Sequence, residues 1–148
     1  MAGVPLRRKR TYNKFHVAAK PDRTWNGIVF ASKGEMERHR KLLVLVQTGQ
    51  IENFERQVPI VLLRDGPDGK ALFKWVVDWR YVENEKVVVE DFTGKMTSLK
   101  LSKIRICAAI HPDLVIRISH KDGDRITFTD CVKGKLPAKP RKKALVKK

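Results

Sequence analysis

Two carboxylates interrupt apolar stretches of this sequence. Asp78 lies within the run of residues 75–79, and Asp91 closes the run of residues 87–92. A carboxylate buried in such a run is unfavourable unless it is paired or bound to a metal ion. Because the two runs are predicted to form neighbouring strands, a shared cation is expected, and Mg²⁺ or Mn²⁺ suits carboxylate oxygen ligands.

Glu35 is a third candidate ligand. On a helix it shares a face with His39, Leu42 and Val46, at i+4, i+7 and i+11, which would direct it toward a sheet. As the residue three positions after Ser32, it fits a capping box equally well, with its carboxylate bonded to the Ser32 amide. The residues alone do not choose between the two roles.

Each strand carboxylate also has a purely structural interpretation. Asp78 could pair with Lys74 or Arg80, and Asp91 could be an exposed residue near a turn. The aliphatic neighbours of both favour burial and therefore a ligand role. Strand alternation places Glu90 on the face opposite Asp91, so Glu90 is predicted to be a neighbour of the site rather than a ligand.

One helix and several strands must position these residues. A helix is predicted over residues 32–48, because Ser32 is an N-cap residue and Gly49 follows the last turn. Apolar runs and turn signals predict a second helix over residues 97–110 and strands at 28–30, 51–63, 71–82, 87–92, 114–119 and 125–129. The strands at 71–82 and 87–92 are expected to pair as a hairpin.

Basic residues are concentrated at the two ends of the chain. Residues 1–20 contain six Lys or Arg and residues 133–148 contain eight, with no acid in either segment, whereas the 112 residues between them carry 18 basic and 16 acidic side chains. This predicts a basic arm (1–20), one domain (21–132) and a basic disordered tail (133–148) that bind a polyanion through phosphate contacts. RNA and anionic membranes would attract such ends as well as DNA does. The candidate DNA-binding residues are Arg7, Arg8, Lys9, Arg10, Lys14, Lys139, Arg141, Lys142 and Lys143.

The rest of the composition is typical of a soluble cytoplasmic protein without a membrane anchor or signal peptide, since no apolar stretch is long enough for either. Cys107 and Cys131 lack metal-site spacing and are expected to be reduced and structural. His39 is predicted to be a packed helix histidine, and Trp75 and Trp79, four apart on one strand, are predicted to share a core-facing side.

Several short segments, in one order, resemble a known family. They are residues 26–38 (NGIVFASKGEMER), similar to the pattern GIxFDSKxEAER, and residues 49–51 (GQI), 56–59 (RQVP), 77–81 (VDWRY) and 88–94 (VVEDFTG). The chain resembles small phage-encoded nuclease-like proteins of the PD-(D/E)XK superfamily whose function is unassigned. These are related in layout to phage endonuclease I, which resolves Holliday junctions.

The resemblance implies an α/β fold with a restriction-endonuclease-like αβββαβ core, in which helices flank a central mixed sheet, followed by an added C-terminal β-hairpin and the basic tails. It implies that Glu35, Asp78 and Asp91 form an acidic site for Mg²⁺ or Mn²⁺, completed by the backbone carbonyl of Phe92. Gln57, within the RQVP segment, could help to position this site. The same resemblance implies a phage protein acting in the cytoplasm of a bacterial host.

One position departs from the motif. The lysine expected two residues after the acid is Thr93 in this chain. A threonine hydroxyl can orient a water but brings no positive charge. Lys95, Lys100 or Lys103 could replace the missing ammonium, because a lysine on a flexible stem needs only to reach the site.

The expected function is metal-dependent endonucleolytic cleavage of DNA, with branched DNA the preferred substrate by analogy with endonuclease I. Paired cuts across a junction would require two sites related by a two-fold axis, and therefore a homodimer. The alternative is a catalytically impaired nuclease fold that acts as a DNA-binding protein. A third class is a structural or RNA-associated protein whose tails bind polyanions.

Overall fold

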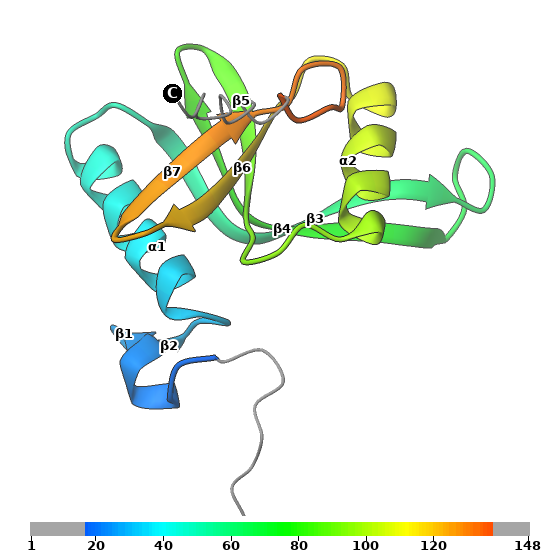
Figure 1. Cartoon of the computed structure of the whole chain (residues 1–148). Helices are drawn as coiled ribbons and strands as arrows, with labels where there is room; N and C mark the ends of the chain where they lie inside the picture. Colours follow the sequence, from blue (N-terminus) through cyan, green and yellow to red (C-terminus); the bar gives the residue numbers. More distant parts are fainter. Residues whose placement is uncertain (1–16, 138–148) are drawn as a thin grey trace, which may run out of the picture.

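The computed structural model describes residues 17–137 of the chain (Figure 1). Its N-terminal segment consists of a 3₁₀ turn, η1 (Lys20–Arg23), and two short paired strands, β1 (Thr24–Trp25) and β2 (Ile28–Val29). This segment lies beside the start of the first long helix, and the predicted strand at residues 28–30 corresponds to β2.

The first long helix, α1 (Lys33–Gln47), has the predicted boundaries. Ser32 is its N-cap and accepts a hydrogen bond at Oγ from the Glu35 amide, 3.1 Å away. The helix ends before Gly49, whose φ of +71° is a left-handed conformation that glycine adopts without strain. The local signals in the sequence were therefore sufficient to define this helix.

The remaining elements build one five-stranded mixed sheet and a second helix. The strands are β3 (Glu52–Arg64), β4 (Ala71–Glu83), β5 (Lys86–Phe92), β6 (Val115–Asp122) and β7 (Arg125–Asp130), and the helix is α2 (Ser98–Ile110). They lie in the order β3-β4-β5-β6-β7, and the predicted hairpin of β4 and β5 is confirmed. Strands β5 and β6 are parallel, which requires a crossover, and α2 provides it; every other pair is antiparallel.

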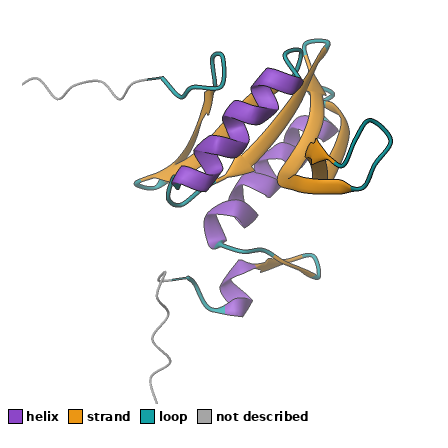
Figure 2. Ribbon diagram, turned by 90° about the vertical axis from the view of Figure 1, so that its right-hand side faces the viewer, coloured by secondary structure: helices purple, strands orange, loops and turns teal. Residues whose placement is uncertain are grey.

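Two hydrophobic clusters join the sheet to the two helices. Alternation along β5 sends Val89 to a cluster that includes Ile104 and Cys107 of α2, and sends Val88 to a cluster that includes Leu42 of α1. In Figure 2 the strands pass between the two helices. The protein is thus an α/β fold with a mixed central sheet covered by one helix on each side.

Three further sequence predictions concern individual side chains. Trp75 and Trp79 are buried on the same side of β4, as expected from their spacing, and they belong to neighbouring hydrophobic clusters. Cys107 and Cys131 are both free thiols. No helix within residues 17–137 is long and apolar enough to cross a membrane.

Candidate functional site

The structure brings Asp78 and Asp91 together at the end of the β4–β5 ladder. The ladder pairs Trp79 with Glu90, and one further step of the same register sets Asp78 opposite Asp91. Asp78 Oδ2 accepts a hydrogen bond from the Phe92 amide at 2.8 Å, and the negative charge of Asp91 acts on the Asp78 carboxyl.

Burial raises the pKa of both groups, and repulsion from neighbouring carboxylates adds to the rise for Asp78. For Asp78, desolvation is the largest cause, followed by the negative charges of Asp91 and Glu35, and together they raise its pKa to about 7. Hydrogen bonds from the Phe92 amide and from Gln57 oppose this rise. For Asp91, desolvation also raises the pKa, against the lowering effect of Lys100.

Helix α1 adds Glu35 to this pair, and we call the three residues the acidic cluster. Glu35 is only 6% exposed, and desolvation is the main cause of its raised pKa, with a further contribution from the charge of Asp91. The backbone of Ala31 opposes this rise, and the Glu35 amide donates to the Ser32 hydroxyl, which is one half of the predicted capping box. Glu35 therefore belongs both to the helix start and to the acidic cluster.

Close packing of the helix start against β5 carries Glu35 into the cluster. A Cβ atom placed on Gly34 would lie 2.4 Å from Cζ of Phe92, far inside van der Waals contact. The absence of a side chain at Gly34 thus lets α1 approach the end of β5, and Glu35 is the next residue of the helix.

Lys100, from α2, is the lysine that reaches the acidic cluster. Its ammonium lies 2.5 Å from Oδ2 of Asp91. Lys95 is exposed, and its described hydrogen bond is made by its backbone carbonyl, which accepts from Thr93 Oγ1 at 2.8 Å. Lys103 acts on Asp91 only as a more distant charge, and its ammonium lies 5.7 Å from the centre of the Phe73 ring.

The acidic cluster borders an open pocket of about 490 Å³. The lining combines strand and helix-start residues with two arginines: Arg23, Ile28, Val29, Phe30, Ala31, Glu35, Arg56, Gln57 and Asp78. We call this space the Arg56 pocket. Gln57 donates from Nε2 to Oδ1 of Asp78 at 3.2 Å, in keeping with the predicted positioning role of its side chain.

The carboxylates of the acidic cluster are the ligand type that a hard divalent cation prefers, but their oxygens are not arranged around a single position where the ion would lie. Within residues 17–137, no three acidic, histidine or cysteine side chains are arranged to hold a metal ion. The oxygens of Asp78 are turned to Gln57 and Phe92. Oδ2 of Asp91 is buried against the Lys100 ammonium. The carboxylate oxygens of Asp78 and Asp91 are hard donors, which is the ligand type that Mg²⁺ and Mn²⁺ prefer.

His39 is a packed side chain, as predicted. Its Nδ1 accepts a hydrogen bond from Trp79 Nε1 at 3.1 Å, and burial together with the charge of Arg56 lowers its pKa to about 4. Its ring also packs against Phe30 and Phe54. His39 is therefore neutral near pH 7 and holds α1 against the sheet.

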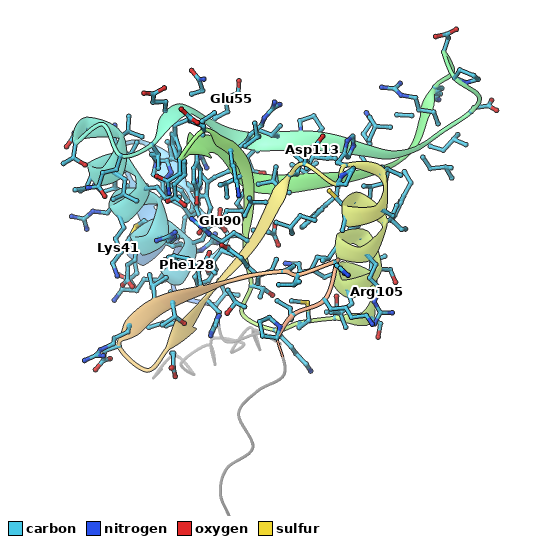
Figure 3. The ribbon with its side chains drawn as sticks, turned by 90° about the horizontal axis from the view of Figure 1, so that it is seen from above. Lys41, Glu55, Glu90, Arg105, Asp113 and Phe128 are labelled. Atoms are coloured by element: carbon cyan, nitrogen blue, oxygen red, sulfur yellow. The ribbon has the colours of Figure 1, made fainter. Side chains whose placement is uncertain are left out.

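Glu90 lies on the opposite face from Asp91, as predicted, in a buried polar network that the sequence did not reveal. Arg38 of α1 donates to both oxygens of Glu90, from Nε at 2.6 Å and from Nη2 at 3.1 Å, and the Tyr81 hydroxyl donates to Oε2. Figure 3 labels Glu90 near Phe128, whose ring lies 5.2 Å from the Arg38 guanidinium. The network joins α1 to the sheet.

Arg117 of β6 extends this network to the edge strand. It donates to the Tyr81 hydroxyl at 3.2 Å, to Glu83 at 2.8 Å and to Asp130 at 2.7 Å. A charged residue between Ile116 and Ile118 was the available sequence signal, because an arginine in an apolar strand needs buried partners. This network explains Glu90 structurally and separates it from the acidic cluster.

Two further groups of basic residues concern the site: the arginines of the pocket lining and the predicted DNA-binding residues. Arg23 and Arg56 line the pocket but were absent from the predicted site. The predicted DNA-binding residues Arg7, Arg8, Lys9, Arg10, Lys14, Lys139, Arg141, Lys142 and Lys143 lie outside the described residues.

A scan against protein-family models, a search of curated proteins and a search of solved structures each return no match to this chain.

Proposed function

We propose that this protein is a divalent-metal-dependent endonuclease of the PD-(D/E)XK kind, which hydrolyses phosphodiester bonds of DNA. The observation that carries the proposal is the convergence of Glu35, Asp78 and Asp91, from α1, β4 and β5, beside an open pocket. Three neighbouring carboxylates whose pKa values are raised by burial are a costly arrangement for a purely structural role. A bound cation would offset that cost.

In this proposal Asp78 and Asp91 hold Mg²⁺ or Mn²⁺, and Glu35 supplies the third carboxylate; the Phe92 carbonyl is a further predicted ligand. When bound, the ion lowers the pKa of an attacking water and offsets charge on the phosphate oxygens. Gln57 and the Phe92 amide orient the Asp78 carboxylate through the hydrogen bonds they donate to it.

Lys100 takes the place of the lysine that the motif would put at position 93. It approaches the cluster from α2, and its ammonium lies against Asp91. Thr93 cannot fill this role, because its hydroxyl is uncharged. The side chain is only 8% exposed, and its hydroxyl already donates to the Lys95 carbonyl. An ammonium beside the carboxylates can hold the attacking water or a phosphate oxygen.

The proposed substrate is DNA, on the grounds of the basic ends of the chain and of the resemblance to endonuclease I. The basic ends of the chain suit a phosphate backbone, and the relation in layout to endonuclease I favours branched DNA. A homodimer would place two sites for paired cuts, and a phage protein would act in the cytoplasm of a bacterial host.

The test is incubation of the full chain with supercoiled, linear and four-way-junction DNA in the presence of Mg²⁺ or Mn²⁺. Asp78→Asn keeps the size of the side chain but removes its negative charge, and should reduce the cleavage rate by about 100-fold or more, the scale seen when a group that stabilises the transition state is lost. Asp113→Asn, at an exposed acid, is the matched control and should cleave like the wild type. Equal cleavage by wild type and Asp78→Asn would refute the proposal.

The second candidate function is DNA binding without turnover. Thr93 at the motif position favours it, as does the close pairing of Lys100 with Asp91, which already neutralises part of the cluster. This alternative predicts salt-sensitive DNA affinity that Asp78→Asn leaves unchanged, and no metal-dependent cleavage.

A further inference from the structure

Arg56 is a cation beside the acidic cluster that forms no salt bridge within the described residues. Its Nε atom is buried and has no hydrogen-bond partner in the described structure. A buried donor left without a partner is costly, so its retention calls for a ligand or another compensating contact.

The guanidinium of Arg56 is held in a defined place. Its Cζ lies 4.8 Å from the centre of the Phe30 ring, a cation–π contact that restricts the plane of the group without using its N–H donors. Its charge lowers the pKa of both Glu35 and His39, so it acts on the interior of the site and not only on solvent.

The other polar side chains at the entrance to the Arg56 pocket are already engaged. Arg23 donates from Nη1 to the Phe30 carbonyl at 2.5 Å and from Nε to the Ala18 carbonyl at 3.2 Å. Gln57 donates to Asp78. Arg56 is therefore the arginine of the lining whose guanidinium makes no hydrogen bond or salt bridge within the described residues.

The pocket places the Arg56 side chain in the same lining as the carboxylates. Its volume of about 490 Å³ falls within the range of small-ligand sites, and Glu35 and Asp78 form part of the same lining. A ligand in it would meet a positive guanidinium and a carboxylate surface. A phosphodiester oriented with one anionic oxygen on Arg56 fits this division of charge, because guanidinium binds phosphate oxygens strongly.

We propose that the Arg56 pocket is the subsite for a DNA backbone phosphate next to the bond that is cut, and that Arg56 binds one of its anionic oxygens. The assignment rests on the proposed nuclease function and adds to it the residue that aligns the substrate strand against the acidic cluster. It does not depend on the basic ends of the chain.

The first experiment observes Arg56 directly in the full-length, metal-free protein. The arginine Nε–H resonances are recorded by NMR during titration with the dinucleotide d(TpT), which carries a single phosphodiester. The Arg56 resonance should shift and exchange more slowly with solvent, whereas that of Arg64, an exposed arginine on the same strand, should not. The uncharged methylphosphonate analogue of d(TpT) should leave Arg56 unaffected; a response equal to that of d(TpT), or no response to either, would overturn the assignment.

The second experiment measures the dependence of binding and cleavage on the guanidinium. Arg56→Gln should weaken d(TpT) binding about tenfold, the scale of one hydrogen bond to a charged group, and Arg56→Lys should recover only part of the loss, because lysine lacks the planar fork. Arg64→Gln is the matched control. Unfolding curves of each variant separate loss of binding from loss of fold.

The outcomes distinguish this inference from the proposed function. Binding of d(TpT) at Arg56 without any cleavage would keep the subsite and remove the hydrolase. Metal-dependent cleavage that Arg56→Gln and Arg64→Gln leave equally unchanged would keep the hydrolase and remove the subsite.

Discussion

Asp78 and Asp91 lie where the side chains of two strands meet, and their raised pKa values result mainly from burial away from solvent. The ordinary pKa of Asp78 is 3.8, and in the folded chain it is about 7. Between these values the folded state binds more protons than the unfolded state, so the contribution of Asp78 to stability falls as the pH rises. His39 opposes this trend, because its pKa is lowered from 6.5 to about 4.

The prediction that follows compares two proteins without metal. We expect the melting temperature of Asp78→Asn minus that of the wild type to increase from pH 4 to pH 7, because only the wild type loses a proton from this position. Thermal unfolding in chelator across this range measures the difference, and the His39 contribution cancels. A difference that stays constant or decreases with pH would contradict the raised pKa.

Lys100 and Lys95 make a matched pair for testing which lysine serves the site. Lys100→Ala should lower the cleavage rate by about 100-fold, because it removes the ammonium beside Asp91, whereas Lys95→Ala should leave the rate nearly unchanged. Single-turnover cleavage of four-way-junction DNA measures both. A larger loss in Lys95→Ala would assign the role to the loop before α2 instead.

At the scale of elements, α1 depends on a close approach to β5. Gly34→Ala should destabilise the fold by about 1–3 kcal/mol through overpacking, less the roughly 1 kcal/mol that alanine gains in helix propensity. Because the new methyl group would meet the Phe92 ring, the double variant with Phe92→Leu should lose less stability than the sum of the two single variants. Urea unfolding of the four proteins tests this, and additive losses would show that the ring is not the obstacle.

The buried pair of Arg38 and Glu90 anchors the same helix. Glu90→Gln should cost about 3–5 kcal/mol, because it leaves the Arg38 guanidinium buried without its counter-charge. The double variant Arg38→Met, Glu90→Leu should be more stable than Glu90→Gln, since no unpaired charge remains. Chemical denaturation measures both, and a Glu90→Gln variant as stable as the wild type would show that solvent reaches the pair.

At the scale of the whole molecule, the proposed function assigns DNA affinity to the basic ends of the chain and cleavage to the domain between them. Removal of residues 138–148, which contain six Lys or Arg, should weaken DNA binding and flatten its dependence on salt, because each phosphate contact contributes about 0.9 to the slope of log affinity against log salt concentration. Cleavage of a dinucleotide-sized diester should be unaffected. Affinity titrations at several salt concentrations test this; an unchanged slope would mean that these residues do not touch the backbone.

Local patterns in the sequence determined most of the elements. The N-cap at Ser32, the glycine after α1 and the turns between apolar runs predicted both long helices and the strands within a few residues. These signals act between neighbours in the chain, so periodicity and turn chemistry suffice to recognise them. Asp78 and Asp91 were selected because acids among aliphatic residues stand out against an apolar background, and Glu35 because it shares a helix face with Leu42 and Val46.

The tertiary structure alone decided which groups meet. The parallel crossover through α2 delivers Lys100, and not Lys95, to Asp91. The pairing of β3 with β4 and the packing of the helix start bring Arg56 to the pocket, and Arg38 reaches Glu90 across fifty-two positions of sequence. Such encounters depend on strand order, register and the close contact of Gly34 with Phe92, and these are set by packing between distant segments rather than by any local pattern.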